Sequence, residues 1–151
     1  MLFRSNKEVR ESAAWSLGEI KPNDQELLLE IVKLLEHEEA GIRFNAVEAL
    51  GDIKPTNQEV LLEIAKLLKH ENADIRYHAF EILALIKPTN QEVLLEIVNL
   101  LKHEQAGIQF NAVQALADIK PTNQEVLLEI AKLLKHENKY IRHKEIGRAH
   151  V

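Results

Sequence analysis

Apolar residues recur with the period of an α-helix along most of this chain. Between residues 42 and 53 they fall on one stripe when each residue is advanced by about 100°: Ile42, Ala46, Ala49, Leu50 and Ile53. This stripe predicts an amphipathic helix over roughly Ile42 to Ile53. From Val60 to Leu68 the apolar arc is much wider, which predicts a second helix that is packed on several sides.

The segment between the two predicted helices carries stop and start signals. Lys54 precedes Pro55, and a residue before proline avoids the α-helical region, so the first helix is expected to end there. The sequence Thr56-Asn57-Gln58-Glu59 has the form of a capping box, which predicts that the Thr56 side chain caps the second helix. In the first unit Asn23 stands at the same position and is expected to act in the same way.

This two-helix pattern repeats every 33 residues. The four prolines are Pro22, Pro55, Pro88 and Pro121, and they define units 8–40, 41–73, 74–106 and 107–139, followed by a partial fifth unit over 140–145. The second and fourth units differ at only four of their 33 positions. Because one helical pair cannot bury both of its faces, the units must stack into a solenoid.

Two common repeat families do not fit this pattern. The W-x2-L-G-x2-Y start of tetratricopeptide repeats and the T-P-L-H-x-A start of ankyrin repeats are both absent. The segment IRFNAVEALGDI, residues 42–53, instead resembles the first helix of short HEAT-like repeats, which reads roughly V-R-x-x-A-x-x-A-L-G-x-I. The resemblance covers residues 8 to about 145, and Gln109 is the one departure from the opening arginine. It implies an all-α fold, a right-handed α-α superhelix of the armadillo-like helical kind, with four helical hairpins and part of a fifth.

Both ends of the chain depart from the repeat. Glu145 replaces the alanine that each complete unit carries at this position, and residues 146–151 fit no HEAT pattern. Residues 1–5 and 146–151 resemble the translation of a sequencing adapter, so we expect both to be non-native and the chain to be a metagenomic fragment of a larger bacterial repeat protein. Flanking repeats of the same chain are then missing, the ends expose apolar surface, and the lack of a signal peptide carries no information.

Composition excludes several kinds of chemistry. The 151 residues include no cysteine, which excludes disulfides, thiol catalysis and cysteine-bound metal centres. The formal net charge of −5 argues against a nucleic-acid-binding protein. No apolar run approaches the length of about 18 residues that a membrane-spanning helix needs. We therefore expect a cytoplasmic protein that uses no cofactor and binds neither nucleic acid nor membranes.

Histidine is followed by glutamate four times, at His37, His70, His103 and His136. Deoxyhypusine hydroxylase, a di-iron enzyme of HEAT-like repeats, also has His-Glu pairs, but there they lie in the first helix of a unit. Here they end the second helix, where a histidine is expected to interact favourably with the helix C-terminus. Phycobilin lyases contain the same short repeat, so a bilin-binding enzyme is the other alternative. The sequence shows neither a nucleophile–base pair nor a phosphate-binding loop.

Two sets of surface positions are candidates for partner binding. The second helices are expected to present polar rows on the concave side, either as a groove or as solvated Glu–Lys pairs: Glu30, Glu63, Glu96 and Glu129 beside Lys33, Lys66, Asn99 and Lys132. The first helices diverge at their fifth and eighth positions, both expected on the outer face: Ser12, Asn45, His78 and Asn111, and Trp15, Glu48, Glu81 and Gln114.

Aromatic residues of the first helices have two interpretations. Trp15, the only tryptophan, is either a partner contact or packs against a missing upstream unit. Phe44, Tyr77 and Phe110 are expected to pack between units, because small residues beside them let the next helix approach. Taken together, the sequence favours a non-catalytic protein–protein interaction scaffold whose partner is an unidentified protein.

Overall fold

The structure is a computed structural model that describes residues 5–135. This part of the chain forms eight α-helices and no strand, and the helices build the α-α solenoid that the repeat predicts. The expected partial fifth unit, the segment 146–151 and the first four residues lie outside the described residues. No helix within residues 5–135 is long and apolar enough to cross a membrane.

Each unit contributes one longer and one shorter helix. The longer A helices are α1 (Asn6–Ile20), α3 (Ala40–Ile53), α5 (Ala73–Ile86) and α7 (Ala106–Ile119). The shorter B helices are α2 (Gln25–Lys33), α4 (Gln58–Lys66), α6 (Gln91–Asn99) and α8 (Gln124–Lys132). Each B helix runs directly into a 3₁₀ turn: η1 (Leu34–Glu36), η2 (Leu67–Lys69), η3 (Leu100–Lys102) and η4 (Leu133–Lys135).

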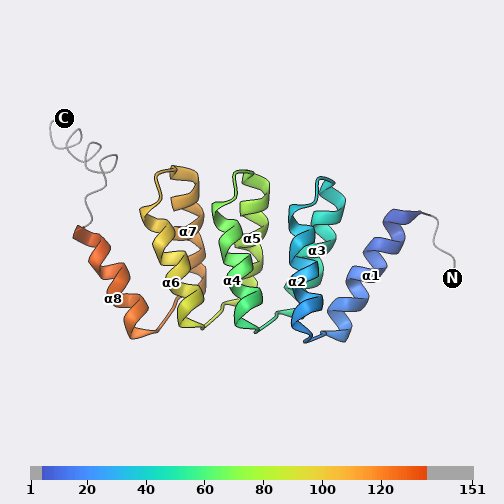
Figure 1. Ribbon diagram of the computed structural model, residues 1–151, viewed down its shortest axis with the longest axis horizontal. Helices are drawn as coiled ribbons and strands as arrows, with labels where there is room; N and C mark the ends of the chain where they lie inside the picture. Colours follow the sequence, from blue (N-terminus) through green and yellow to red (C-terminus); the bar gives the residue numbers. More distant parts are fainter. Residues whose placement is uncertain (1–4, 136–151) are drawn as a thin grey trace.

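The helices form two layers, one of A helices and one of B helices (Figure 1). Within each layer every helix packs on its neighbours of the same kind, from α1 to α7 and from α2 to α8. The Lys-Pro turns lie along the lower edge of this view and the histidine turns along the upper edge. The chain is therefore a stack in which each unit contacts mainly the units before and after it.

The closely packed hairpins are offset from the sequence units by one helix. They consist of a B helix and the A helix that follows it: α2 with α3, α4 with α5, and α6 with α7. By contrast α1 and α2, which belong to the same sequence unit, are not close neighbours. Within residues 5–135, the first A helix and the last B helix therefore each lack a hairpin partner (Figure 1).

The interior is filled mainly by the B helices, as their wide apolar arc predicts. In α4 the side chains of Val60, Leu61 and Ile64 are at most 1% exposed, and Leu68 in the following turn is completely buried. Full burial of such a side chain contributes roughly 1.5–3 kcal/mol. The A helices supply smaller residues to the same core, including Ala46 and Ala49.

Each A helix ends at a lysine in the left-handed region. Lys21, Lys54, Lys87 and Lys120 have φ between 51° and 53°, and the backbone N–H of each donates to the carbonyl of the leucine four residues earlier. The predicted helix end before proline is confirmed, and the structure shows that the chain leaves the helix through this left-handed conformation. Such a conformation costs a residue with a Cβ about 1–2 kcal/mol.

The predicted capping box at the start of the B helices is wrong. The cap residue of α4 is Asn57, not Thr56, and it makes no side-chain capping bond. Its amide instead donates to the carbonyl of Asn23 in the preceding unit over 3.5 Å, as Asn123 donates to Thr89 over 3.2 Å. In the first unit the cap is Asp24, whose carboxylate accepts from the Leu27 N–H. The asparagines thus connect units rather than cap helices.

Candidate protein-binding surface

Three aromatic side chains lie at equivalent positions on consecutive A helices. Phe44 of α3, Tyr77 of α5 and Phe110 of α7 are 59%, 53% and 60% exposed. The residue four positions later lies on the same helix face, and it is Glu48, Glu81 or Gln114. In α1 the two residue types are exchanged, with Glu11 at the aromatic position and Trp15 at the acidic one. We call these four pairs the aromatic–acid stripe.

The exposure of these rings corrects the expectation that they pack between units. Phe44 contacts the next unit through its ring, which lies edge-on to His78 with 5.2 Å between ring centroids and an interplanar angle of 74°. Tyr77 contacts Phe80 of its own helix, with 6.0 Å between centroids. Phe44, Tyr77 and Phe110 are therefore each more than half exposed and open to a partner.

The expectation that His78 lies on the outer face is also wrong. His78 is only 4% exposed, because the ring of Phe44 covers it from the preceding unit. His78 Nδ1 lies 3.6 Å from an oxygen of Glu81 and has no hydrogen-bond partner within the described residues. Ser12, Asn45 and Asn111 at the same position are half-buried. The fifth position therefore points toward the seam between A helices.

The eighth position is the more accessible of the two divergent sets. Trp15 is 59% exposed and Glu48 is exposed, whereas Glu81 and Gln114 are half-buried. Between α3 and α5 the surface is hollowed by about 260 Å³, in a depression lined by Ala40, Arg43, Phe44, Asp74, Tyr77, His78 and Glu81. This hollow brings together two aromatic rings, two carboxylates and the buried imidazole.

The arginines beside the stripe are held by the preceding turn. Arg43 donates to the carbonyl oxygens of His37 and Glu38 over 2.7 and 3.1 Å, and Arg76 makes the same contacts with His70 and Glu71. Gln109, the departure from the repeat pattern, donates to the carbonyl of His103. The arginine of the repeat therefore closes the turn between B and A helices, and a glutamine amide can replace it.

The repeated histidines lie at the ends of the 3₁₀ turns and make a contact that was not predicted. Nδ1 of His37, His70 and His103 accepts the backbone N–H two residues later, over 3.0–3.1 Å. Each bond lies within the turn that links a B helix to the next A helix. Among residues 5–135 no group of three or more histidine, aspartate or glutamate side chains is arranged to hold a metal ion. His136 lies outside the described residues.

On the B helices the predicted polar rows consist largely of pairs within one helix. Glu30–Lys33, Glu63–Lys66 and Glu129–Lys132 lie at 3.0, 3.2 and 2.8 Å. In the third unit Asn99 replaces the lysine, and Glu96 lies 3.8 Å from Lys69 of the preceding unit instead. The hydrogen bond and the charge of Lys132 lower the pKa of Glu129, and Glu129 raises the pKa of Lys132 in return.

A second ladder on the B helices was not predicted. Gln25 donates to Glu59 over 2.6 Å, Gln58 to Glu92 over 2.6 Å, and Gln91 to Glu125 over 2.5 Å. Each bond joins one unit to the next. The signal was present as a glutamine directly before the glutamate in every unit, but the sequence alone does not show that the two residues of successive units meet.

Comparisons with known proteins identify the repeat. The sequence profile of HEAT repeats matches residues 1–66 and 60–146. No curated protein matches the chain in sequence. A search of solved structures finds an engineered protein at 21% identity and a TM-score of 0.49, with 87% of this chain aligned to 64% of the other. The chain thus spans less than two thirds of that protein's length.

Two further structures are similar at the same level. A designed armadillo repeat protein in complex with the peptide (KR)4 is 22% identical, with a TM-score of 0.49 over 93% of this chain and 74% of the other. A second engineered protein is 22% identical, with a TM-score of 0.46 over 93% of this chain and 73% of the other.

Proposed function

Because the chain belongs to the family of HEAT repeat proteins, we propose that it is a non-catalytic scaffold that binds another protein through the aromatic–acid stripe. The observation that carries the proposal is the alignment of Phe44, Tyr77 and Phe110, each more than half exposed, on three consecutive A helices. Large aromatic side chains are enriched among the residues that contribute most to protein–protein binding. A single exposed aromatic residue needs no explanation, but a row of three does.

The surroundings of the rings indicate the chemistry of the partner. Glu48, Glu81 and Asp74 place carboxylates beside Phe44 and Tyr77, while the guanidinium groups of Arg43 and Arg76 are bound to backbone carbonyls. A protein segment with apolar and basic side chains fits this pattern, because arginine and lysine interact favourably with both carboxylates and aromatic faces. The net charge of −5 favours the same kind of partner through long-range attraction.

The B-helix surface is the weaker candidate. There is a hollow of about 380 Å³ between α2 and α4, but two of the carboxylates that line it are already paired, Glu30 with Lys33 and Glu63 with Lys66. A partner would have to replace these pairs. The B-helix positions Glu63, Lys66, Glu96 and Asn99 therefore serve as a comparison surface for testing the stripe.

Peptide selection tests the proposal. Peptides that bind the full chain are selected from a random display library, and their affinities are measured by fluorescence anisotropy. We expect the selected peptides to be rich in basic and apolar residues. The Phe44→Ser/Tyr77→Ser variant should weaken their binding by at least about tenfold, which corresponds to about 1.4 kcal/mol, and added salt should weaken it further.

A matched variant on the other layer is the control. Glu63→Gln/Lys66→Gln changes two B-helix side chains that are each about half exposed and should leave the affinities unchanged, and circular dichroism shows whether both variants keep their helices. Peptides that lose affinity with the B-helix variant and not with the stripe variant would contradict the proposal. Selection of no peptide above background would contradict it as well.

A further inference from the structure

The first A helix lacks the cover that the other A helices have. Ile20 of α1 is 71% exposed, whereas its counterparts Ile53 and Ile119 are each 7% exposed. Ala13 is exposed, while the equivalent alanines Ala46, Ala79 and Ala112 are buried. In α3, α5 and α7 the apolar face that contains these residues is covered by the preceding B helix. The apolar face of α1 around Ala13 and Ile20 is therefore a site where a B helix would pack, and no described helix occupies it. We call this site the seat.

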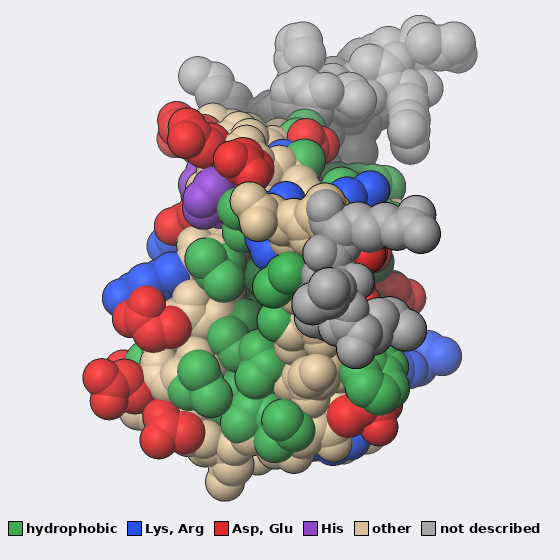
Figure 2. Space-filling model, turned by 90° about the vertical axis from the view of Figure 1, so that its right-hand side faces the viewer, with side chains coloured by type: hydrophobic (Ala, Val, Ile, Leu, Met, Phe, Trp, Pro, Cys, Tyr) green, Lys and Arg blue, Asp and Glu red, His purple; other side chains and the backbone are tan. Residues whose placement is uncertain are grey.

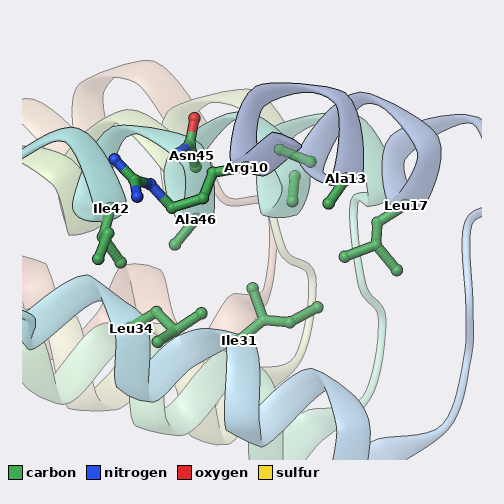
Figure 3. A pocket seen from close by; sticks show the side chains of 10 residues that line it. Arg10, Ala13, Leu17, Ile31, Leu34, Ile42, Asn45 and Ala46 are labelled. Atoms are coloured by element: carbon green, nitrogen blue, oxygen red, sulfur yellow. The ribbon is translucent and has the colours of Figure 1, made fainter. Parts of the chain in front are cut away.

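This seat is an apolar surface at the N-terminal end of the stack. Figure 2 views this end and shows hydrophobic side chains gathered at its centre, with acidic side chains around part of the edge. A groove of about 170 Å³ lies between α1, α2 and α3, and the side chains of Ala13, Leu17, Ile31 and Leu34 point into it (Figure 3). Leu34 is 42% exposed here, whereas its counterpart Leu67 is 8% exposed.

The other end of the described chain presents the matching surface. Residues 58–69 and 124–135 have the same sequence, and the first of these segments covers α5. In α8 and its turn the corresponding leucines are open: Leu127 is 43% and Leu134 is 89% exposed, against 1% for Leu61 and 0% for Leu68. The helix α8 thus carries the residues that cover an A helix elsewhere in the molecule, but within residues 5–135 no A helix packs on this face.

From these two faces we propose that the chain associates with further copies of itself head to tail, with α8 of one copy seated on α1 of the next. The template is the internal pairing of α4 with α5 and of α6 with α7. The polar ladder would continue across the joint, because Gln124 stands at the position of Gln58 and Gln91, and Glu26 stands at the position of their acceptors Glu92 and Glu125. Such a contact joins two different surfaces and leaves both ends open, so it builds chains rather than closed dimers.

The segment that follows α8 in sequence carries charged residues at positions where α3 has small ones. Glu145 and Arg148 stand at the positions of Ala46 and Ala49 in α3, and both alanines are at most 3% exposed. Two charged side chains in such a seam would lose hydration without a partner. At the same positions α1 carries Ala13 and Ser16, and the Ser16 hydroxyl already donates to the carbonyl of Ser12. A second copy is therefore the better occupant.

Sedimentation velocity of the full chain tests this association. The average sedimentation coefficient of the wild type should rise with concentration beyond the value of a dimer. Ala13→Arg on α1 and Leu134→Arg on the turn after α8 alter exposed residues, so both variants should fold, which circular dichroism checks. Each variant alone should remain monomeric at every concentration.

Mixing the two variants distinguishes head-to-tail stacking from other association. Each variant keeps one intact end, so an equimolar mixture should form a one-to-one dimer and nothing larger. Asn99→Arg alters an exposed residue on α6, inside the stack, where the other units carry a lysine, and it should associate like the wild type. A wild type that stays monomeric, variants that still associate alone, or a mixture that stays monomeric would each overturn the proposal. If the wild type stays monomeric, the two faces are instead available to flanking repeats of a longer chain or to residues 136–151.

The salt response separates this association from binding at the stripe. Copies that each carry a formal net charge of −5 repel one another, so added salt should strengthen self-association. Binding of a basic peptide to the stripe should weaken under the same conditions. Failure of one proposal therefore leaves the other intact.

Discussion

The segments 58–69 and 124–135 have one sequence and the same succession of α-helix and 3₁₀ turn, but they have different surroundings. Leu61 in the interior is 1% exposed and Leu127 at the end is 43% exposed. The cause is α5, which packs on α4, whereas no described helix follows α8. Burial in this molecule is therefore a property of the neighbouring unit and not of the segment itself.

The largest expected effect comes from shortening the same leucine in both places. Leu61→Ala should lower the free energy of unfolding by about 2–5 kcal/mol, because it leaves a cavity in a tightly packed core. Leu127→Ala should lower it by about 1 kcal/mol or less, because much of that side chain is already in water. Urea unfolding followed by circular dichroism at low protein concentration measures both. Equal losses would show that the end and the interior are packed alike.

A smaller effect is expected where two A helices approach closely. A Cβ on Gly18 would lie 2.8 Å from the Cβ of Asp52, so Gly18→Ala should destabilise the α1–α3 contact by about 1–3 kcal/mol. Gly41 has no atom within 4 Å of the same added group. Gly41→Ala should therefore be neutral or stabilising by up to about 1 kcal/mol, through helix propensity alone. Thermal unfolding of both variants measures the two effects. A Gly18→Ala protein as stable as the wild type would contradict the close approach of α1 and α3.

Replacing a left-handed lysine with glycine should change the free energy of unfolding by about 1 kcal/mol or less. Lys54→Gly should stabilise the protein by roughly 0.5–1 kcal/mol, because glycine adopts a positive φ without strain. Lys21→Gly at the first turn should raise the free energy of unfolding by less. The Lys21 ammonium donates to the carbonyl of Asp52 over 2.6 Å, and the variant loses this bond, which contributes about 1 kcal/mol. Chemical unfolding measures both changes. A larger gain for Lys21→Gly would show that this bond contributes nothing.

The smallest effect is expected for the exposed ion pairs, which do not distinguish end from interior. Glu129→Gln in α8 and Glu63→Gln in α4 should both leave stability nearly unchanged, because exposed pairs contribute little. Since Lys132 lowers the pKa of Glu129, the contribution of the pair is complete above the ordinary glutamate pKa and is lost as the pH falls through the lowered value. An NMR titration of the wild type should show Glu129 with a midpoint below 4.5, and Lys132→Gln should raise it.

Much of the fold could be predicted from the sequence because each sequence signal occurs again in every unit. The 33-residue period, the apolar stripe of Ile42 to Ile53 and the proline after it together place the helices, and the family profile agrees. The capping box failed because Thr56 and Asn57 are both good cap residues. Which of them ends the turn depends on the contact of Asn57 with Asn23 in the preceding unit.

The candidate surface could be predicted only in part. The divergent residues Trp15 and Glu48 are accessible, as expected from their positions on the helix. His78 is buried because Phe44 of another unit lies over it, and a helical wheel contains no information about neighbouring units. The same reason explains the exposed rings: the sequence shows that Phe44, Tyr77 and Phe110 share a register, but not that the next helix leaves them uncovered.

The offset between sequence units and packed hairpins has a consequence for how such a chain can change in length. Residues 55–87 run from one proline to the residue before the next and contain the whole hairpin of α4 and α5. Deleting this block would join Lys54 to Pro88 and recreate the same Lys-Pro turn. An in-frame duplication of the block would do so as well. Gene rearrangements between prolines can therefore shorten or extend the array by complete hairpins without requiring a new loop.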